Sequence, residues 1–247
     1  SSGHLAIGRE ILGVQASEDL VFEVTVHAAT VLATIIVFRK QIGRLLAGLF
    51  KFKYNDETDY ILTICVSMIP VFVVGVFFKD YVEALFSSLY VVGGALLLTA
   101  ALLFFSDRKS QAPASSLPAP RSGISWWQAL VIGLGQAVAV IPGLSRSGTT
   151  ISTGLLSGVR REDVAQFSFL MVIVPILGEA FLDVVGGDMA SSTIGFLPLA
   201  VGFVAAFLSG LFACKVMIAL VKKAKLKWFA LYCLLAGAAT LICTALL

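Results

Sequence analysis

One short stretch of the chain gathers side chains that are suited to binding an anion. Residues Pro142–Thr150 hold one arginine, two serines, two threonines and two glycines within nine positions. The planar guanidinium of Arg146 matches phosphate oxygens. Hydroxyls of Ser145, Ser147 and Thr150 add hydrogen-bond donors, and the glycines allow backbone N–H groups to turn toward an anion. The stretch predicts a phosphate-binding loop.

A helix after this loop would add to the attraction for an anion. We expect Thr149 and Thr150 to open a short helix over 149–158, whose N-terminus carries partial positive charge. Gly148 and Thr149 then join the expected substrate-binding residues. The alternative is a polar loop that breaks a helix and serves packing only.

A second polar stretch stands at the start of the chain, where the sequence reads Ser1-Ser2-Gly3-His4. His4 is the one side chain in the two stretches that exchanges a proton near neutral pH, so it could act as nucleophile, base or acid. Ser1 and Ser2 are candidate nucleophiles or hydrogen-bond donors. The residue types alone leave these roles open.

The composition places both stretches in a membrane protein. Hydrophobic residues make up 58% of the 247 residues and charged residues 13%, whereas soluble domains carry about a quarter charged residues. An arginine at membrane depth is costly, and it normally faces a cavity, a partner or an anionic ligand. The composition therefore favours an anion site inside a bilayer protein.

Six apolar segments are long enough to cross a bilayer, which takes about 20 residues. We expect these spans at 20–38, 60–78, 89–105, 163–185, 194–214 and 228–247. Residues 1–18 are too short to cross, and so are the segments 126–141 and 149–158 that flank the polar loop. We therefore expect two re-entrant hairpins, which enter and leave the membrane on one side.

The distribution of lysine and arginine orients these spans. Basic residues gather in three links, which the positive-inside rule places in the cytoplasm: 39–59, 106–125 and 215–227. Links poor in basic residues then fall outside: 79–88 and 186–193. In this layout the two hairpins enter from opposite faces.

An internal match supports two inverted halves. Ser2-Gly3 aligns with Ser147-Gly148 when the chain is laid on itself, and Gly13-Val14 then aligns with Gly158-Val159. We predict an all-α polytopic membrane protein with an inverted repeat, each half being a re-entrant helical hairpin plus three transmembrane helices. The single domain 1–247 divides into halves 1–105 and 126–247, joined by a linker at 106–125. The two polar stretches should then meet near the midplane.

These residues carry a resemblance to a known family. The stretches Ser1–His4 and Pro142–Thr150, together with Phe167-Ser168-Phe169-Leu170 and the order of spans, resemble the undecaprenyl pyrophosphate phosphatase family, also known as bacitracin-resistance proteins. The resemblance implies hydrolysis of undecaprenyl (C55) diphosphate to undecaprenyl phosphate, which recycles a lipid carrier for cell-wall synthesis. It also implies a bacterial plasma (inner) membrane location and a site that opens toward the periplasmic or outer face.

The resemblance also assigns roles to particular residues. His4, Ser1 and Arg146 are expected to be catalytic. The expected substrate-binding residues are Ser2, Ser145, Ser147, Gly148, Thr149 and Thr150. The implied cofactor is a divalent cation, Mg²⁺ or Ca²⁺, and the implied partners are a polyprenyl diphosphate lipid and the membrane, with no nucleic acid.

One part of the family pattern has no match in this sequence. The family places a Glu-x-x-x-Glu segment, thought to hold the metal or act as base, just before the first polar stretch. Because the chain starts at Ser1, inside that stretch, we expect those glutamates upstream and assign no metal ligand here. If the 247 residues were the whole polypeptide, little or no phosphatase activity would be expected.

Two other functions are compatible with parts of the sequence. A phosphatidic-acid-phosphatase-type enzyme requires a histidine six residues after the arginine, where this chain has Ser152. The stronger alternative is a polyprenyl-phosphate lipid transporter or flippase, because inverted repeats with broken helices are typical of transporters. Phosphate release from the lipid discriminates between an enzyme and a transporter.

Overall fold

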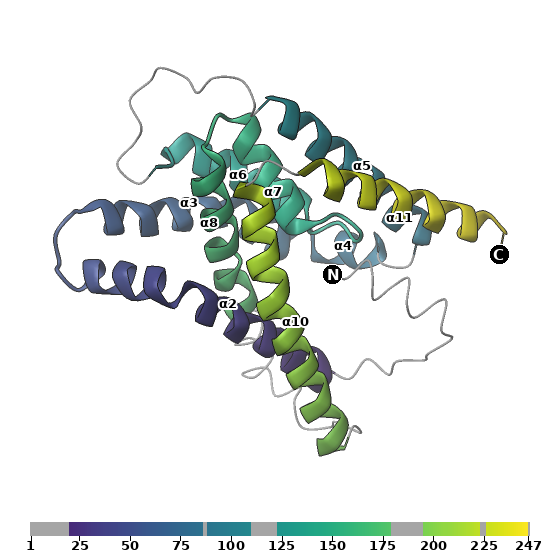
Figure 1. Ribbon diagram of the computed structural model, residues 1–247, viewed down its shortest axis with the longest axis horizontal. Helices are drawn as coiled ribbons and strands as arrows, with labels where there is room; N and C mark the ends of the chain where they lie inside the picture. The colour runs from purple at the N-terminus through teal and green to yellow at the C-terminus, as the bar shows by residue number, and fades with distance from the viewer. Residues whose placement is uncertain (1–19, 86–87, 110–122, 179–194, 223–225, 247) are drawn as a thin grey trace.

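The computed structural model describes residues 20–85, 88–109, 123–178, 195–222 and 226–246, and all regular structure in these ranges is α-helix (Figure 1). This confirms the predicted all-α class. The inverted repeat stays a prediction, because the first expected hairpin, 1–18, lies outside the described residues.

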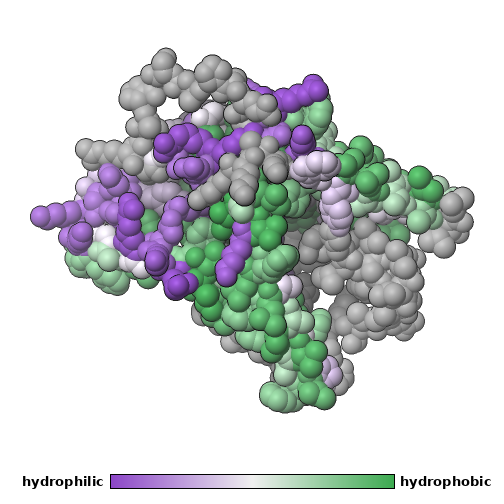
Figure 2. All heavy atoms as spheres, viewed as in Figure 1, coloured by the Kyte–Doolittle hydropathy of each residue, from purple (hydrophilic) through white to green (hydrophobic). Residues whose placement is uncertain are grey.

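Among the described residues, four helices are long and apolar enough to cross a membrane. They are α3 (Asp56–Phe77), α5 (Leu89–Lys109), α10 (Phe196–Lys222) and α11 (Leu226–Leu246). At about 1.5 Å per residue each reaches the roughly 30 Å of a hydrocarbon core. Large hydrophobic side chains of α10 are exposed, among them Phe212, and Figure 2 shows the hydrophobic surface that they help to form. The protein is therefore a multi-pass membrane protein.

Helix α2 (Leu20–Leu49) is longer than the expected first span, 20–38, which it contains. It continues through the basic residues Arg39, Lys40 and Arg44 without interruption. The basic segment is thus a continuation of the helix, and its cytoplasmic location stays a prediction. The expected outer link 79–88 likewise contains a short helix, α4 (Lys79–Leu85).

The expected span 163–185 is interrupted. Helix α8 (Arg161–Met171) ends after 11 residues, a turn follows at Val172, and helical structure resumes over 173–178. Pro175 explains the break, because proline donates no backbone hydrogen bond and its ring crowds the carbonyl four residues earlier, that of Met171. The expected span 163–185 thus contains a break at Val172, and its residues 179–185 lie outside the described part of the chain.

The expected linker 106–125 also begins too early. Residues 106–109 are the last turn of α5, and Ser106 and Asp107 are buried there. Asp107 forms an ion pair with Arg161 at the start of α8. Ser106 and Asp107 are thus part of the packed structure, because Ser152 and Arg161 from later segments of the chain form hydrogen bonds with them. Residues 110–122 lie outside the described part of the chain.

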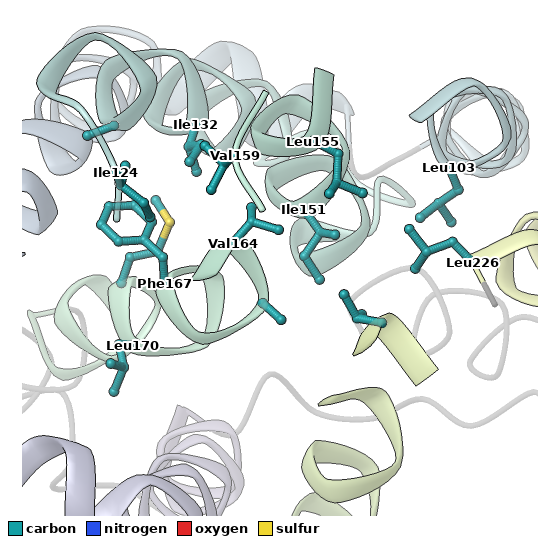
Figure 3. Packing of buried hydrophobic residues seen from close by; sticks show 14 of the residues in the cluster. Leu103, Ile124, Ile132, Ile151, Leu155, Val159, Val164, Phe167, Leu170 and Leu226 are labelled. Atoms are coloured by element: carbon teal, nitrogen blue, oxygen red, sulfur yellow. The ribbon is translucent and has the colours of Figure 1, made fainter. Parts of the chain in front are cut away.

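The main hydrophobic core lies around two short helices, α6 (Trp126–Val138) and α7 (Arg146–Leu156). Figure 3 shows side chains from α6, α7 and α8 meeting there, among them Ile132, Ile151 and Val164. Leu103 of α5 and Leu226 of α11 extend the same cluster. This core fixes the two helices between which the polar loop runs.

Candidate functional site: the α6–α7 anion loop

The second expected hairpin is present as a pair of short helices. α6 has 13 residues and α7 has 11, so each is well short of the roughly 20 residues that a span requires. The two helices pack against each other near the centre of the molecule (Figure 1). A capping box at Ser125 and Gln128 fixes the start of α6. The polar stretch forms the turn between the helices, and we call residues 142–148 the anion loop.

Helix α7 begins earlier than predicted. Its first residue is Arg146 and its N-cap is Ser145, so Thr149 and Thr150 lie inside the helix rather than at its opening. The Ser145 hydroxyl accepts a hydrogen bond from Gly148 N at 3.1 Å, and Thr149 N donates to the Ser145 carbonyl at 2.8 Å. A serine that caps a helix outweighs the low helix propensity of the Ser-Gly pair that follows. The predicted positive helix end is therefore located at Arg146 itself.

Glycine 143 permits the tight turn before this cap. Its φ is +90°, a conformation that other residues rarely adopt, and an added Cβ would lie 2.5 Å from the carbonyl oxygen of Val92. The loop thus lies directly against the backbone of α5.

A threonine of α5 anchors the other end of the loop. Thr99 Oγ1 accepts a hydrogen bond from Ser145 N at 3.2 Å and donates its own proton to the Ala95 carbonyl at 2.9 Å. Leu144 packs in a small buried cluster with Ala95 and Ala139. Thr99 was not predicted; the available signal was a lone hydroxyl in an apolar run.

The expected anion-binding residues divide into an exposed and a buried group. Arg146 is exposed and Ser145 and Ser147 are half-buried, whereas Gly148, Thr149 and Thr150 are buried. Arg146 adds its charge to the positive end of α7, and the first turn of α7 holds no acidic residue. Positive charge at a helix N-terminus is unfavourable without an anion and favours binding one.

The buried group makes its contacts inside the protein. Thr150 Oγ1 lies 2.6 Å from Ser168 Oγ of α8 and 2.9 Å from the Arg146 carbonyl oxygen. Thr149 Oγ1 and Gln136 Oε1 are buried, and neither atom has a hydrogen-bond partner among the described residues. The predicted substrate roles of Thr149 and Thr150 stay predictions.

The first polar stretch, with Ser1, Ser2 and His4, lies outside the described residues, so the expected meeting of the two stretches stays a prediction. The described part of the chain also contains no group of three or more His, Cys, Asp or Glu side chains that could hold a metal ion. The anion loop itself offers hydroxyls and a guanidinium rather than carboxylates, and so no described residue is assigned to the implied divalent cation.

A cavity of about 220 Å³ lies elsewhere, between α2, α3 and α8. None of the anion-loop residues lines it. Its walls are mixed in charge: Gln41, Arg44, Leu45, Asp56, Glu57, Tyr60, Asp163 and Gln166. This cavity is therefore separate from the predicted phosphate site.

The corner between α7 and α8 holds two arginines in different settings. Arg160 is exposed and donates to Asp163 at 2.7 Å, and this hydrogen bond raises the pKa of Arg160. Arg161 is largely buried and donates to Asp107 at 2.8 Å. Of these two arginines, Arg160 is therefore the solvent-exposed charge and Arg161 the structural one.

Comparison with known proteins gives a consistent result over the whole chain. Residues 1–239 match the family model described as bacitracin resistance protein BacA. A protein of Parabacteroides distasonis named undecaprenyl-diphosphatase is 55% identical over 250 residues, covering 100% of this chain and 91% of that protein. A protein of the same name from Bacteroides thetaiotaomicron is 54% identical over 246 residues, covering 98% of this chain and 90% of that protein.

A more distant relative shares the same name. The undecaprenyl-diphosphatase of Methanococcus vannielii is 35% identical over 237 residues, covering 96% of this chain and 90% of that protein. The resemblance drawn from the two polar stretches is thus confirmed, and the chain belongs to the bacitracin resistance protein BacA family.

Proposed function

We propose that this protein hydrolyses undecaprenyl diphosphate to undecaprenyl phosphate and inorganic phosphate. The name shared by relatives that are 54% and 55% identical supports this activity. The observation in the structure that carries it is the position of Arg146, an exposed arginine at the positive N-terminus of a buried short helix. The same names favour hydrolysis over the transporter alternative.

The anion loop supplies the grip on the diphosphate. Arg146 offers two parallel N–H donors to phosphoryl oxygens, and Ser147 adds a hydroxyl at the same turn. The N–H groups of Arg146 and Ser147 precede the first intrahelical bond of α7, which runs from Thr149 N to the Ser145 carbonyl. These donors oppose the negative charge that grows on the transferred phosphoryl group.

The reaction adds water across one phosphoric anhydride bond. An oxygen nucleophile, or the imidazole of His4, attacks the terminal phosphorus, and the bond from that phosphorus to the bridging oxygen breaks. The bridging oxygen leaves with undecaprenyl phosphate. The terminal phosphoryl group is transferred to a water oxygen, directly or after it has been bound to the nucleophile, and is released as inorganic phosphate. Ser1, His4 and water remain the alternatives for the first attack.

The membrane holds the rest of the substrate. The exposed apolar surfaces of the long helices face lipid, and a polyprenyl tail lies in the same layer while its diphosphate reaches the loop. On family resemblance, the proposal places the protein in the bacterial plasma (inner) membrane, with its site open toward the periplasmic or outer face. A divalent cation, Mg²⁺ or Ca²⁺, is part of the proposal on family resemblance.

Phosphate release by the full-length protein in detergent tests the proposal. Wild-type protein with C55 diphosphate and Mg²⁺ or Ca²⁺ should release phosphate, and Arg146→Ala should lose most of this activity. Movement of the labelled lipid across vesicle membranes without phosphate release would overturn hydrolysis in favour of transport.

A further inference from the structure

A hydroxyl of α8 reaches the first turn of α7. Ser168 Oγ lies 2.6 Å from Thr150 Oγ1, and the two residues are 4% and 1% exposed. Thr150 Oγ1 also lies 2.9 Å from the Arg146 carbonyl oxygen and 3.3 Å from the Ser147 carbonyl oxygen. The contact therefore links residue 168 to the two residues that open α7.

Counting protons gives this contact a direction. A threonine hydroxyl has one proton, and within a helix that proton normally goes to a carbonyl three or four residues earlier. When Thr150 donates to Arg146 or Ser147, Ser168 must donate to Thr150. This direction satisfies both buried hydroxyls, whereas the reverse leaves the proton of Ser168 without an acceptor recorded in the described part of the chain.

The first turn of α7 is thereby held from two sides. On one side Thr99 of α5 accepts from Ser145 N, and on the other Ser168 of α8 acts through Thr150. Between them lies Arg146, an exposed residue whose carbonyl oxygen is the end of the hydroxyl chain. The direction in which the Arg146 guanidinium points depends on the position of the first turn of α7.

We propose that Ser168 is a positioning residue for the diphosphate. Ser168 donates to Thr150, and Thr150 donates to the backbone carbonyl of Arg146 and not to phosphate, so that Ser168 holds the backbone of Arg146 in place through Thr150. This inference rests on the proposed hydrolysis. The Thr150 hydroxyl has one proton, and because it donates that proton to a backbone carbonyl it has none to donate to a phosphoryl oxygen. Small displacements of a positioning group reduce rates strongly, by about 100-fold for roughly 1 Å.

The same helix supplies a matched control. Ser152, two residues after Thr150, lies 3.1 Å from Ser106 of α5, and both side chains are fully buried. This second hydroxyl pair also joins α7 to a neighbouring helix. It lies toward the middle of α7, however, and does not end on the carbonyls of the first turn.

The experiment compares the two pairs in the full-length protein. Ser168→Ala and Thr150→Val should each lower kcat for phosphate release by about 10- to 100-fold, with a smaller rise in KM. Thr150→Ser, which keeps the hydroxyl, should recover most of the kcat that Thr150→Val loses. Ser106→Ala should stay within about threefold of wild type. The double variant Ser168→Ala/Thr150→Val should be no slower than either single variant, because both break one chain.

Affinity for inorganic pyrophosphate, measured by titration calorimetry, gives a readout that does not depend on turnover. Ser168→Ala should weaken it and Ser106→Ala should not, at similar unfolding temperatures of the two variants. If wild-type protein released no phosphate, the proposed function would be wrong, and pyrophosphate affinity alone would decide the role of Ser168. Equal effects of Ser168→Ala and Ser106→Ala, or additive effects in the double variant, would overturn the proposal. Should Ser168→Ala fail to fold, the comparison of Thr150→Val with Thr150→Ser decides it in the same way.

Discussion

Arg161 of α8 and Asp107 of α5 are joined by two hydrogen bonds, although 54 residues separate them in the chain. Arg161 Nη2 donates to Asp107 Oδ1 at 2.8 Å and to the Asp107 carbonyl oxygen at 3.1 Å. The two side chains are only 13% and 6% exposed. The pair fixes the start of α8, the helix that carries Ser168, to the end of α5, the helix that carries Thr99.

Breaking this pair should destabilise the fold. We expect Asp107→Ala to lower the free energy of unfolding by about 3–5 kcal/mol, because it leaves a buried guanidinium without its carboxylate. Denaturant titration in detergent, followed by tryptophan fluorescence, measures this loss. The control is Asp163→Ala, which removes the partner of exposed Arg160 and should cost about 1 kcal/mol or less. Equal losses in the two variants would contradict a structural role for the buried pair.

Arg146→Lys should lose most of the phosphate-releasing activity even though it keeps the positive charge. An ammonium group is a point charge, and it cannot form the two parallel hydrogen bonds of a guanidinium. We expect kcat/KM to fall by about 100-fold or more, which corresponds to about 3 kcal/mol of transition-state stabilisation. Arg160→Lys, at an exposed ion pair, should be within twofold of wild type, which corresponds to about 0.5 kcal/mol or less. Near-normal turnover by Arg146→Lys would show that the two parallel hydrogen bonds of the guanidinium are not required.

Gly143→Ala should disrupt the anion loop through two separate effects. Its φ of +90° disfavours alanine, and the added Cβ would meet the backbone of Val92. Gly158→Ala isolates the first effect, because φ is +88° there and an added Cβ has nothing within 4 Å. We expect Gly158→Ala to cost about 1–2 kcal/mol of stability with little change in kcat. Gly143→Ala should cost more stability and most of the activity. Similar kinetics of the two variants would show that the close contact with Val92 does not determine the conformation of the anion loop.

Removal of divalent cations should stop phosphate release. We expect EDTA to abolish the activity of the full-length protein and Mg²⁺ or Ca²⁺ to restore it, since a divalent cation offsets the charge of a diphosphate. EDTA saturated with Mg²⁺ beforehand is the control for chelator effects on the detergent micelle. Full activity in excess EDTA would remove the divalent cation from the proposal.

The sequence predicted the membrane class and the second hairpin because both depend on apolar run lengths. Helix ends were predicted less well, because they depend on single local bonds. Helix α7 starts at Arg146 through the cap at Ser145, three residues before the predicted start at Thr149. The break after Met171 has a signal in the sequence, Pro175, because proline disrupts the helical turn that precedes it.

The residues of the candidate anion loop could be chosen from composition, but the contacts that support the loop could not be predicted. Arg146 and the loop hydroxyls were evident from residue type, since an arginine in an apolar setting is unusual. Thr99 and Asp107 were not evident, because their partners, Ser145 and Arg161, are 46 and 54 residues away. A single sequence shows which side chains can form hydrogen bonds, but the packing of distant helices decides which of them meet.

The close approach of α5 and α11 limits which residues can stand where the two helices touch. An added Cβ on Gly237 would lie 3.0 Å from the carbonyl oxygen of Gly93, so the two helices touch backbone to backbone. Helix α5, which carries Thr99, is thus supported by main-chain contact together with the side chain of Leu241, which lies against Gly93. Exposed residues of α11 such as Leu235 and Ile242 can therefore be exchanged for other apolar side chains, whereas a side chain at Gly93 or Gly237 would force the two helices apart.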